Sequence, residues 1–184
     1  YKGGYTPFSF ELTKDINWSG DNVLALGVDS TERKDIPPFG GLIDYLTFGG
    51  IYRDVHIRAV ADTFIANVFA KPLNVLHDDR SVNVRVYVEG KTDRDLDLAA
   101  ELRDGTKVIA NGSTKVVGTE THDINLANLG PIELWSTDKS KLYDVRVTIK
   151  NGNTVLDHYE TRIGFREAKF TPEGFFLNGK HLKL

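Results

Sequence analysis

The segment from Pro37 to Ile57, PPFGGLIDYLTFGGIYRDVHI, contains a single acid, Asp44, between two Gly-Gly pairs. Five large apolar or aromatic residues surround this acid, although loops rarely need an acid in such surroundings. An ionised carboxylate can cap a turn by accepting backbone N–H groups, or it can accept strong hydrogen bonds from a bound group. The residues alone favour the turn cap and leave the binding role open.

The other residue types that perform chemistry show no catalytic spacing. Five histidines are scattered without the intervals of a metal site, and the sequence has no cysteine: His56, His77, His122, His158 and His181. The sequence also lacks a GxSxG elbow, a P-loop and a GxGxxG turn that opens a helix. A glycosidase would need two carboxylates facing each other across a cleft, and no pair is marked here. We therefore predict no catalytic residue, no metal site and no cofactor in this chain.

Alternating apolar and polar residues predict strands on both sides of the Asp44 segment. The runs at Pro7–Leu12 and Asn22–Asp29 alternate, with a Gly-Asp turn before the second, and Gly50–Val60 alternates again. Between them lies Ser30–Gly49, which reads as a loop of a length that is often functional.

A second series of alternating runs begins near Ala61. The clearest are Ser81–Gly90, Asp95–Gly105 and a hairpin around the turn Asn151–Asn153, and further runs occur at 62–73, 106–117 and 121–129. This spacing predicts an antiparallel sandwich of roughly seven strands, immunoglobulin-like in architecture. The tail reads as a linker and a short hairpin that turns at Asn178–Lys180.

The bulk composition excludes several classes of partner. The net charge is −3 and the isoelectric point is near 6.0, so we expect no nucleic-acid partner, and the absence of a long apolar run predicts no membrane partner. The lack of cysteine suits a cytoplasmic location. The chain opens on Tyr1 and contains no methionine, which indicates a fragment or a processed product.

Five ordered motifs carry a family resemblance: GGYTPFSFELT, the run from Asn22 to Val55, LWS…LYDVRVTI, RIGFRE and GFFLNGK. Together they resemble the front half of family 2 glycoside hydrolases, the bacterial β-galactosidase branch most of all. The resemblance implies an all-β chain with a partial jelly-roll (galactose-binding-like) segment followed by an immunoglobulin-like β-sandwich. It assigns residues 1–60 to the later part of the jelly roll, 61–164 to the sandwich, and 165–184 to a linker and first hairpin before a TIM barrel.

The family resemblance also implies a function. The parent protein would be a bacterial, cytoplasmic retaining glycosidase that hydrolyses terminal β-galactosides, with both catalytic glutamates in the barrel. This fragment would be inactive and would meet a galactoside only with the barrel present. Asp44 would be the substrate-binding residue, because the family carries an acid at that distance before the motif that begins at Gly50. Incomplete jelly-roll edges would leave residues 1–60 rearranged or self-associating.

Four further residues receive structural roles. Arg53 and Asp54 are expected to serve the sheet, with Arg53 as a packed ion-pair or carbonyl-binding group. Trp135 and Tyr143 are expected in the core or at a domain interface, and Arg166 is expected to tie the linker to the barrel. Two other readings remain, a stand-alone carbohydrate-binding module and a structural β-sandwich spacer.

Overall fold

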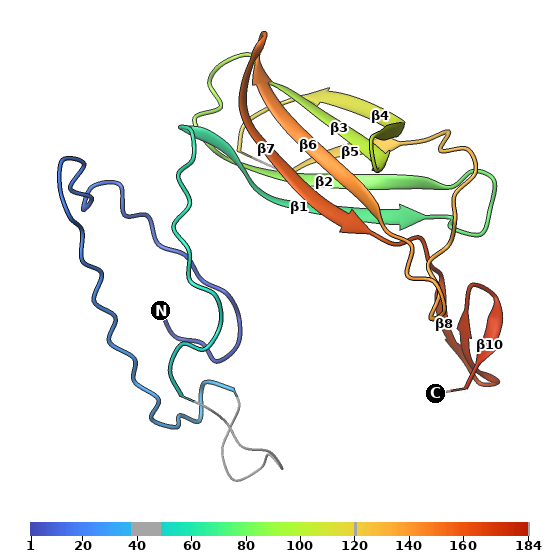
Figure 1. The fold of residues 1–184 in the computed structure, drawn as a ribbon, viewed down its shortest axis with the longest axis horizontal. Helices are drawn as coiled ribbons and strands as arrows, with labels where there is room; N and C mark the ends of the chain where they lie inside the picture. The colour runs from blue at the N-terminus through green and yellow to red at the C-terminus, as the bar shows by residue number, and fades with distance from the viewer. Residues whose placement is uncertain (38–48, 120, 184) are drawn as a thin grey trace. The chain divides into compact units, whose positions relative to one another are not determined.

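The computed structural model describes residues 1–37, 49–119 and 121–183, and its regular structure there is entirely β (Figure 1). The chain divides into two compact units, Tyr1–Ile57 and Arg58–Leu184. Each unit is described by itself below. Within the described ranges, none of the helices that a membrane span would require is present.

All the strands lie in the second unit and form three antiparallel sheets. One sheet has the order β1-β2-β5, another has the order β4-β3-β6-β7, and a small third sheet has the order β10-β9-β8. The strand bounds are β1 Thr63–Leu73, β2 Ser81–Gly90, β3 Asp97–Asp104, β4 Lys107–Lys115, β5 Thr121–Leu126, β6 Tyr143–Asn151, β7 Thr154–Ile163, β8 Ala168–Thr171, β9 Gly174–Leu177 and β10 Lys180–Leu182. The expected strands after Ala61 and the hairpin turns at Asn151–Asn153 and Asn178–Lys180 are therefore confirmed.

The core lies between the two larger sheets. Alternate residues of β2 and β3 face it, and their side chains are at most 1% exposed: Val82, Val84, Val86, Val88, Leu98, Ala100 and Leu102. Each fully buried valine or leucine stabilises the fold by about 1.5–3 kcal/mol relative to an exposed position. The period-2 pattern in the sequence is thus the cause of the two-layer packing.

A carboxylate joins the edge strands of the two larger sheets. Asp157 on β7 accepts hydrogen bonds from the backbone N–H of Ile65 on β1 and from Nη2 of Arg58, both at 2.9 Å. Arg58 also donates to the carbonyl oxygen of Ile65, at 3.0 Å. Since β1 and β7 are both edge strands, this cluster satisfies an edge N–H that neither sheet pairs.

The small third sheet is attached through Asn178, in the turn between β9 and β10. Its side-chain amide donates to the carbonyl oxygen of Trp135 and accepts from the N–H of Glu167, each at 2.9 Å. Its own N–H donates to the carbonyl oxygen of Glu167, at 2.8 Å. Asn178 has a φ of 51°, a left-handed conformation that asparagine tolerates better than most residues.

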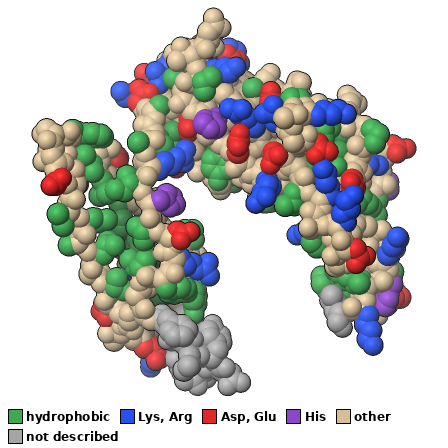
Figure 2. Space-filling view, viewed as in Figure 1, with side chains coloured by type: hydrophobic (Ala, Val, Ile, Leu, Met, Phe, Trp, Pro, Cys, Tyr) green, Lys and Arg blue, Asp and Glu red, His purple; other side chains and the backbone are tan. Residues whose placement is uncertain are grey.

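The first unit corrects the predicted strands at Pro7–Leu12, Asn22–Asp29 and Gly50–Val60. These residues form no strand in the described part of the chain, and their apolar side chains lie exposed, with Val23 at 94% and Ile57 at 76%. Figure 2 shows hydrophobic side chains gathered on the surface of this segment. A strand needs a neighbour to accept and donate its ladder hydrogen bonds, and the described residues of this unit supply none.

Candidate functional site

Asp44, the predicted substrate-binding residue, lies within residues 38–48, outside the described residues. The structure does describe both ends of its loop. Gly49 approaches Ser30 so closely that a Cβ atom at position 49 would collide with the Ser30 side chain. The chain therefore leaves and re-enters this region at one point, which requires glycine at position 49.

Two polar turns precede the Asp44 loop. Asp29 accepts a hydrogen bond from the N–H of Thr31 at 2.9 Å, and Arg33 grips Asp35 with two hydrogen bonds of 2.8 and 2.9 Å. The hydrogen bond from the Thr31 side chain is the main cause that lowers the pKa of Asp29, and the bond from Arg33 lowers the pKa of Asp35. Both carboxylates are fully ionised at neutral pH and already have partners, so they are turn residues.

The residues that follow the loop are exposed. Gly50 adopts a φ of 89°, which favours glycine, and the Arg53 guanidinium lies 5.9 Å from the centre of the Tyr52 ring. Arg53 was expected to be packed in an ion pair or against a carbonyl. That expectation is wrong for the described structure, where Arg53 is exposed, forms no ion pair and contacts an aromatic ring. Its alternating run has formed no sheet that could cover the side chain.

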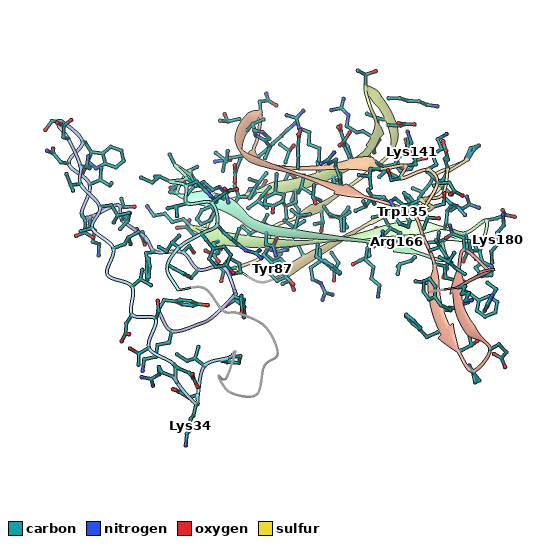
Figure 3. The ribbon with its side chains drawn as sticks, turned by 60° about the horizontal axis from the view of Figure 1, so that its bottom comes forward. Lys34, Tyr87, Trp135, Lys141, Arg166 and Lys180 are labelled. Atoms are coloured by element: carbon teal, nitrogen blue, oxygen red, sulfur yellow. The ribbon has the colours of Figure 1, made fainter. Side chains whose placement is uncertain are left out.

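Tyr143 and Trp135 occupy the positions expected for core and interface residues. Tyr143 is 3% exposed, and its hydroxyl accepts the N–H of Glu133 at 2.9 Å, so its ring is closed to a ligand. Trp135 is half-buried, and its N–H donates to the carbonyl oxygen of Phe165 at 2.8 Å. The guanidinium of Arg166 covers the Trp135 ring at 4.7 Å from its centre, as Figure 3 shows.

The described residues contain one shallow pocket of about 300 Å³ beside Tyr143 and no group of acids or histidines that could hold a metal. Apolar side chains of β4 and of the segment after β5 line it, together with Asp104 and Lys107. Asp104 is paired with Lys141, and this hydrogen bond raises the pKa of the lysine. The pocket thus offers a neutralised carboxylate and no chemistry of its own.

The comparisons with known proteins give the chain its family. The family model for glycosyl hydrolases family 2 matches residues 63–166. A β-galactosidase from Thermoanaerobacterium thermosulfurigenes is 38% identical over 191 residues, which covers 100% of this chain and 26% of that protein. A β-glucuronidase from Bacteroides fragilis is 29% identical, covering 100% of this chain and 28% of that protein. The chain therefore spans about a quarter of the length of these relatives.

Solved structures agree on the fold. A glycosyl hydrolase family 2 member from Bacteroides cellulosilyticus has a TM-score of 0.58 and 23% identity over 68% of this chain and 18% of its own. A β-glucuronidase from Ruminococcus gnavus, solved with D-glucuronic acid, has a TM-score of 0.54 and 22% identity over 68% of this chain and 20% of its own. The family match covers more than half of the chain, and the chain belongs to glycosyl hydrolases family 2.

Proposed function

We propose that the chain is a non-catalytic part of a retaining β-galactosidase-like enzyme that hydrolyses terminal β-galactosides. The observation that carries this proposal is the 38% identity to a β-galactosidase along the whole chain, above the 29% identity to a β-glucuronidase. Retaining hydrolysis needs two carboxyl groups about 5–5.5 Å apart, one as nucleophile and one as acid and base. We assign both groups to the catalytic barrel of the parent enzyme, so the 184-residue chain alone is inactive.

We propose the same domain order for this chain as the family resemblance implies. The sheet orders β1-β2-β5 and β4-β3-β6-β7 support an immunoglobulin-like sandwich over residues 61–164, since that fold pairs its strands in this way. Residues 1–60 would be the later part of a sugar-binding jelly roll, and residues 165–184 the lead-in to the barrel. The alternating runs at Pro7–Leu12 and Asn22–Asp29 would become strands once a jelly roll supplies their partners.

We propose that Asp44 accepts hydrogen bonds from galactoside hydroxyls in the assembled enzyme. The closed base of its loop at Ser30 and Gly49 supports a projecting loop. The acids before it, Asp29 and Asp35, already have partners, so Asp44 is the better candidate for an external donor. A hydrogen bond to a charged group contributes about 1.5–3 kcal/mol, so losing even one costs roughly tenfold or more in kcat/KM.

The test places this chain in the Thermoanaerobacterium thermosulfurigenes β-galactosidase, in exchange for the aligned quarter. We expect the graft to hydrolyse a nitrophenyl β-galactoside faster than the matching β-glucuronide. Asp44→Ala should lower kcat/KM for the galactoside more than tenfold with an unchanged melting temperature, whereas Asp35→Ala should leave kcat/KM within twofold. Unchanged kinetics in Asp44→Ala would remove the sugar-binding role.

The same chain alone tests the reading as a stand-alone carbohydrate-binding module. We expect no measurable galactoside binding by calorimetry, because one carboxylate without opposing walls does not offset the entropy cost of association. Binding by the isolated chain that Asp44→Ala abolishes would favour a binding module over part of an enzyme.

A further inference from the structure

The small β10-β9-β8 sheet has one apolar face. The register places Phe170 opposite Phe175, and Phe175 opposite Leu182, so these three side chains share one face of the sheet. The two phenylalanine ring centres are 4.8 Å apart. We call these three residues the docking face. Phe170 is 78% exposed and is the most exposed large apolar side chain described between residues 58 and 183.

The docking face is not needed to hold the sheet in place. The anchor is the turn at Asn178, whose hydrogen bonds to Trp135 and Glu167 fix the sheet to the segment between β5 and β6 and to the end of β7. Figure 1 shows this sheet extending away from the two larger sheets of its unit. A sheet with three or four residues in each strand needs a second layer to be stable, and the anchored turn leaves one apolar face for that layer.

Arg166 supplies a charged group next to this face. Its guanidinium stacks on Trp135 and is exposed, and within the described ranges it has no carboxylate partner. The neighbouring acid, Glu167, is paired with Lys169 at 2.9 Å. Stacking on the indole holds the planar group in one orientation while its N–H donors remain free, and those donors match a carboxylate.

The local charge balance points to the same kind of partner. The segment from Gly164 to Lys183 carries four cationic side chains against two acidic ones, although the whole chain has a net charge of −3. An apolar face beside an excess of cations fits a protein surface that is apolar and carries an acid.

We infer that the docking face and Arg166 together receive the catalytic domain of a family 2 hydrolase, with a carboxylate of that domain bound to Arg166. This inference rests on the proposed function. About three quarters of the length of the similar β-galactosidase lies outside the stretch aligned with this chain, so such a partner exists in the relatives. Arg166 is a positioning residue here, because it orients a domain and touches no substrate.

The first experiment measures whether the docking face is covered. The chain has no cysteine, so Phe170→Cys gives a single thiol, and Val155→Cys, at a 52% exposed position on β7, gives a matched control. Each variant is treated with a maleimide reagent, in the chain alone and in the graft into the β-galactosidase, and labelling is read from peptides by mass spectrometry. We expect the thiol at position 170 to react more than tenfold more slowly in the graft, and the thiol at position 155 to change less than twofold.

A second series tests Arg166. In the graft, Arg166→Ala should raise the labelling rate at position 170 at least fivefold, because the docked domain separates more often. Arg166→Lys should restore part of the protection, because it keeps the charge. Lys169→Ala serves as a control that removes a nearby cation, and it should leave the rate unchanged.

The outcomes separate this inference from the proposed function. An active graft in which position 170 stays as reactive as in the chain alone overturns the docking inference and leaves the function standing. A protected position 170 in an inactive graft supports docking and counts against the function. Protection in the chain alone that grows with its concentration identifies a second copy as the occupant and overturns the inference. If the graft does not fold, the cysteine is placed at the aligned position of the unmodified β-galactosidase, and full reactivity there has the same meaning.

Discussion

Removal of the Asp157 carboxylate should destabilise the second unit far more than an ordinary surface substitution. One oxygen of Asp157 accepts both the backbone N–H of Ile65 and Nη2 of Arg58, and the Asp157 side chain is only 18% exposed. Ile65 itself is fully buried. In Asp157→Ala the N–H of Ile65 loses its acceptor at the edge of a sheet, where no other strand can replace it.

The size of the effect follows from these contacts. An unsatisfied, partly buried N–H costs about 1–3 kcal/mol. The ion pair adds at most about 1 kcal/mol, because the Arg58 side chain is 39% exposed and water screens its charge. Asp157→Ala should therefore lower the free energy of unfolding by about 2–4 kcal/mol. Asp157→Asn keeps an oxygen for Ile65 and should cost only about 1 kcal/mol.

The assay is urea unfolding followed by tryptophan fluorescence. The chain has two tryptophans, so Trp18→Phe leaves Trp135 as the only reporter of the second unit. The urea midpoint of Asp157→Ala should fall by roughly 1–2 M. Asp123→Ala is the matched control, because Asp123 also pairs with an arginine but is 43% exposed and accepts no backbone N–H that an item of the fold depends on. Equal midpoints for the two alanine variants would refute the assignment of Asp157 as the edge acceptor.

Three further outcomes follow from the structure. The hydrogen bond from Arg85 lowers the pKa of Asp123, so Asp123→Asn should cost at most about 1 kcal/mol at neutral pH, and the difference should disappear as acid protonates the folded carboxyl below its ordinary value of about 3.9. A constant difference down to strong acid would contradict this. Asn178→Ala should increase amide exchange in β8–β10 and leave β2 protected, and exchange that rises equally in both would contradict a local anchor. The exposed apolar residues of the first unit should cause self-association in light scattering, which Val55→Lys should weaken.

The strands of the second unit could be predicted because their signal is local. Four valines at alternate positions from Val82 to Val88 bury one face wherever two such sheets meet, and the Asn151–Asn153 turn closes the β6–β7 hairpin between neighbouring residues. Pro7–Leu12 carries the same alternation and forms no strand in the described residues. Alternation states which face a strand would bury, but a ladder needs a partner, and partners are not encoded in the run itself.

The contacts that matter for function were the hardest to predict, because they join distant parts of the sequence. Asp157 meets Ile65 across 92 positions, and Asn178 meets Trp135 across 43, so no motif spacing marks either pair. The LNGK turn does indicate an asparagine in a left-handed conformation, yet its side-chain partners follow only from the fold. The same reasoning applies to Asp44. Its neighbours in sequence show an unusual acid, and its role depends on the group that faces its loop, which is why the graft is the decisive experiment.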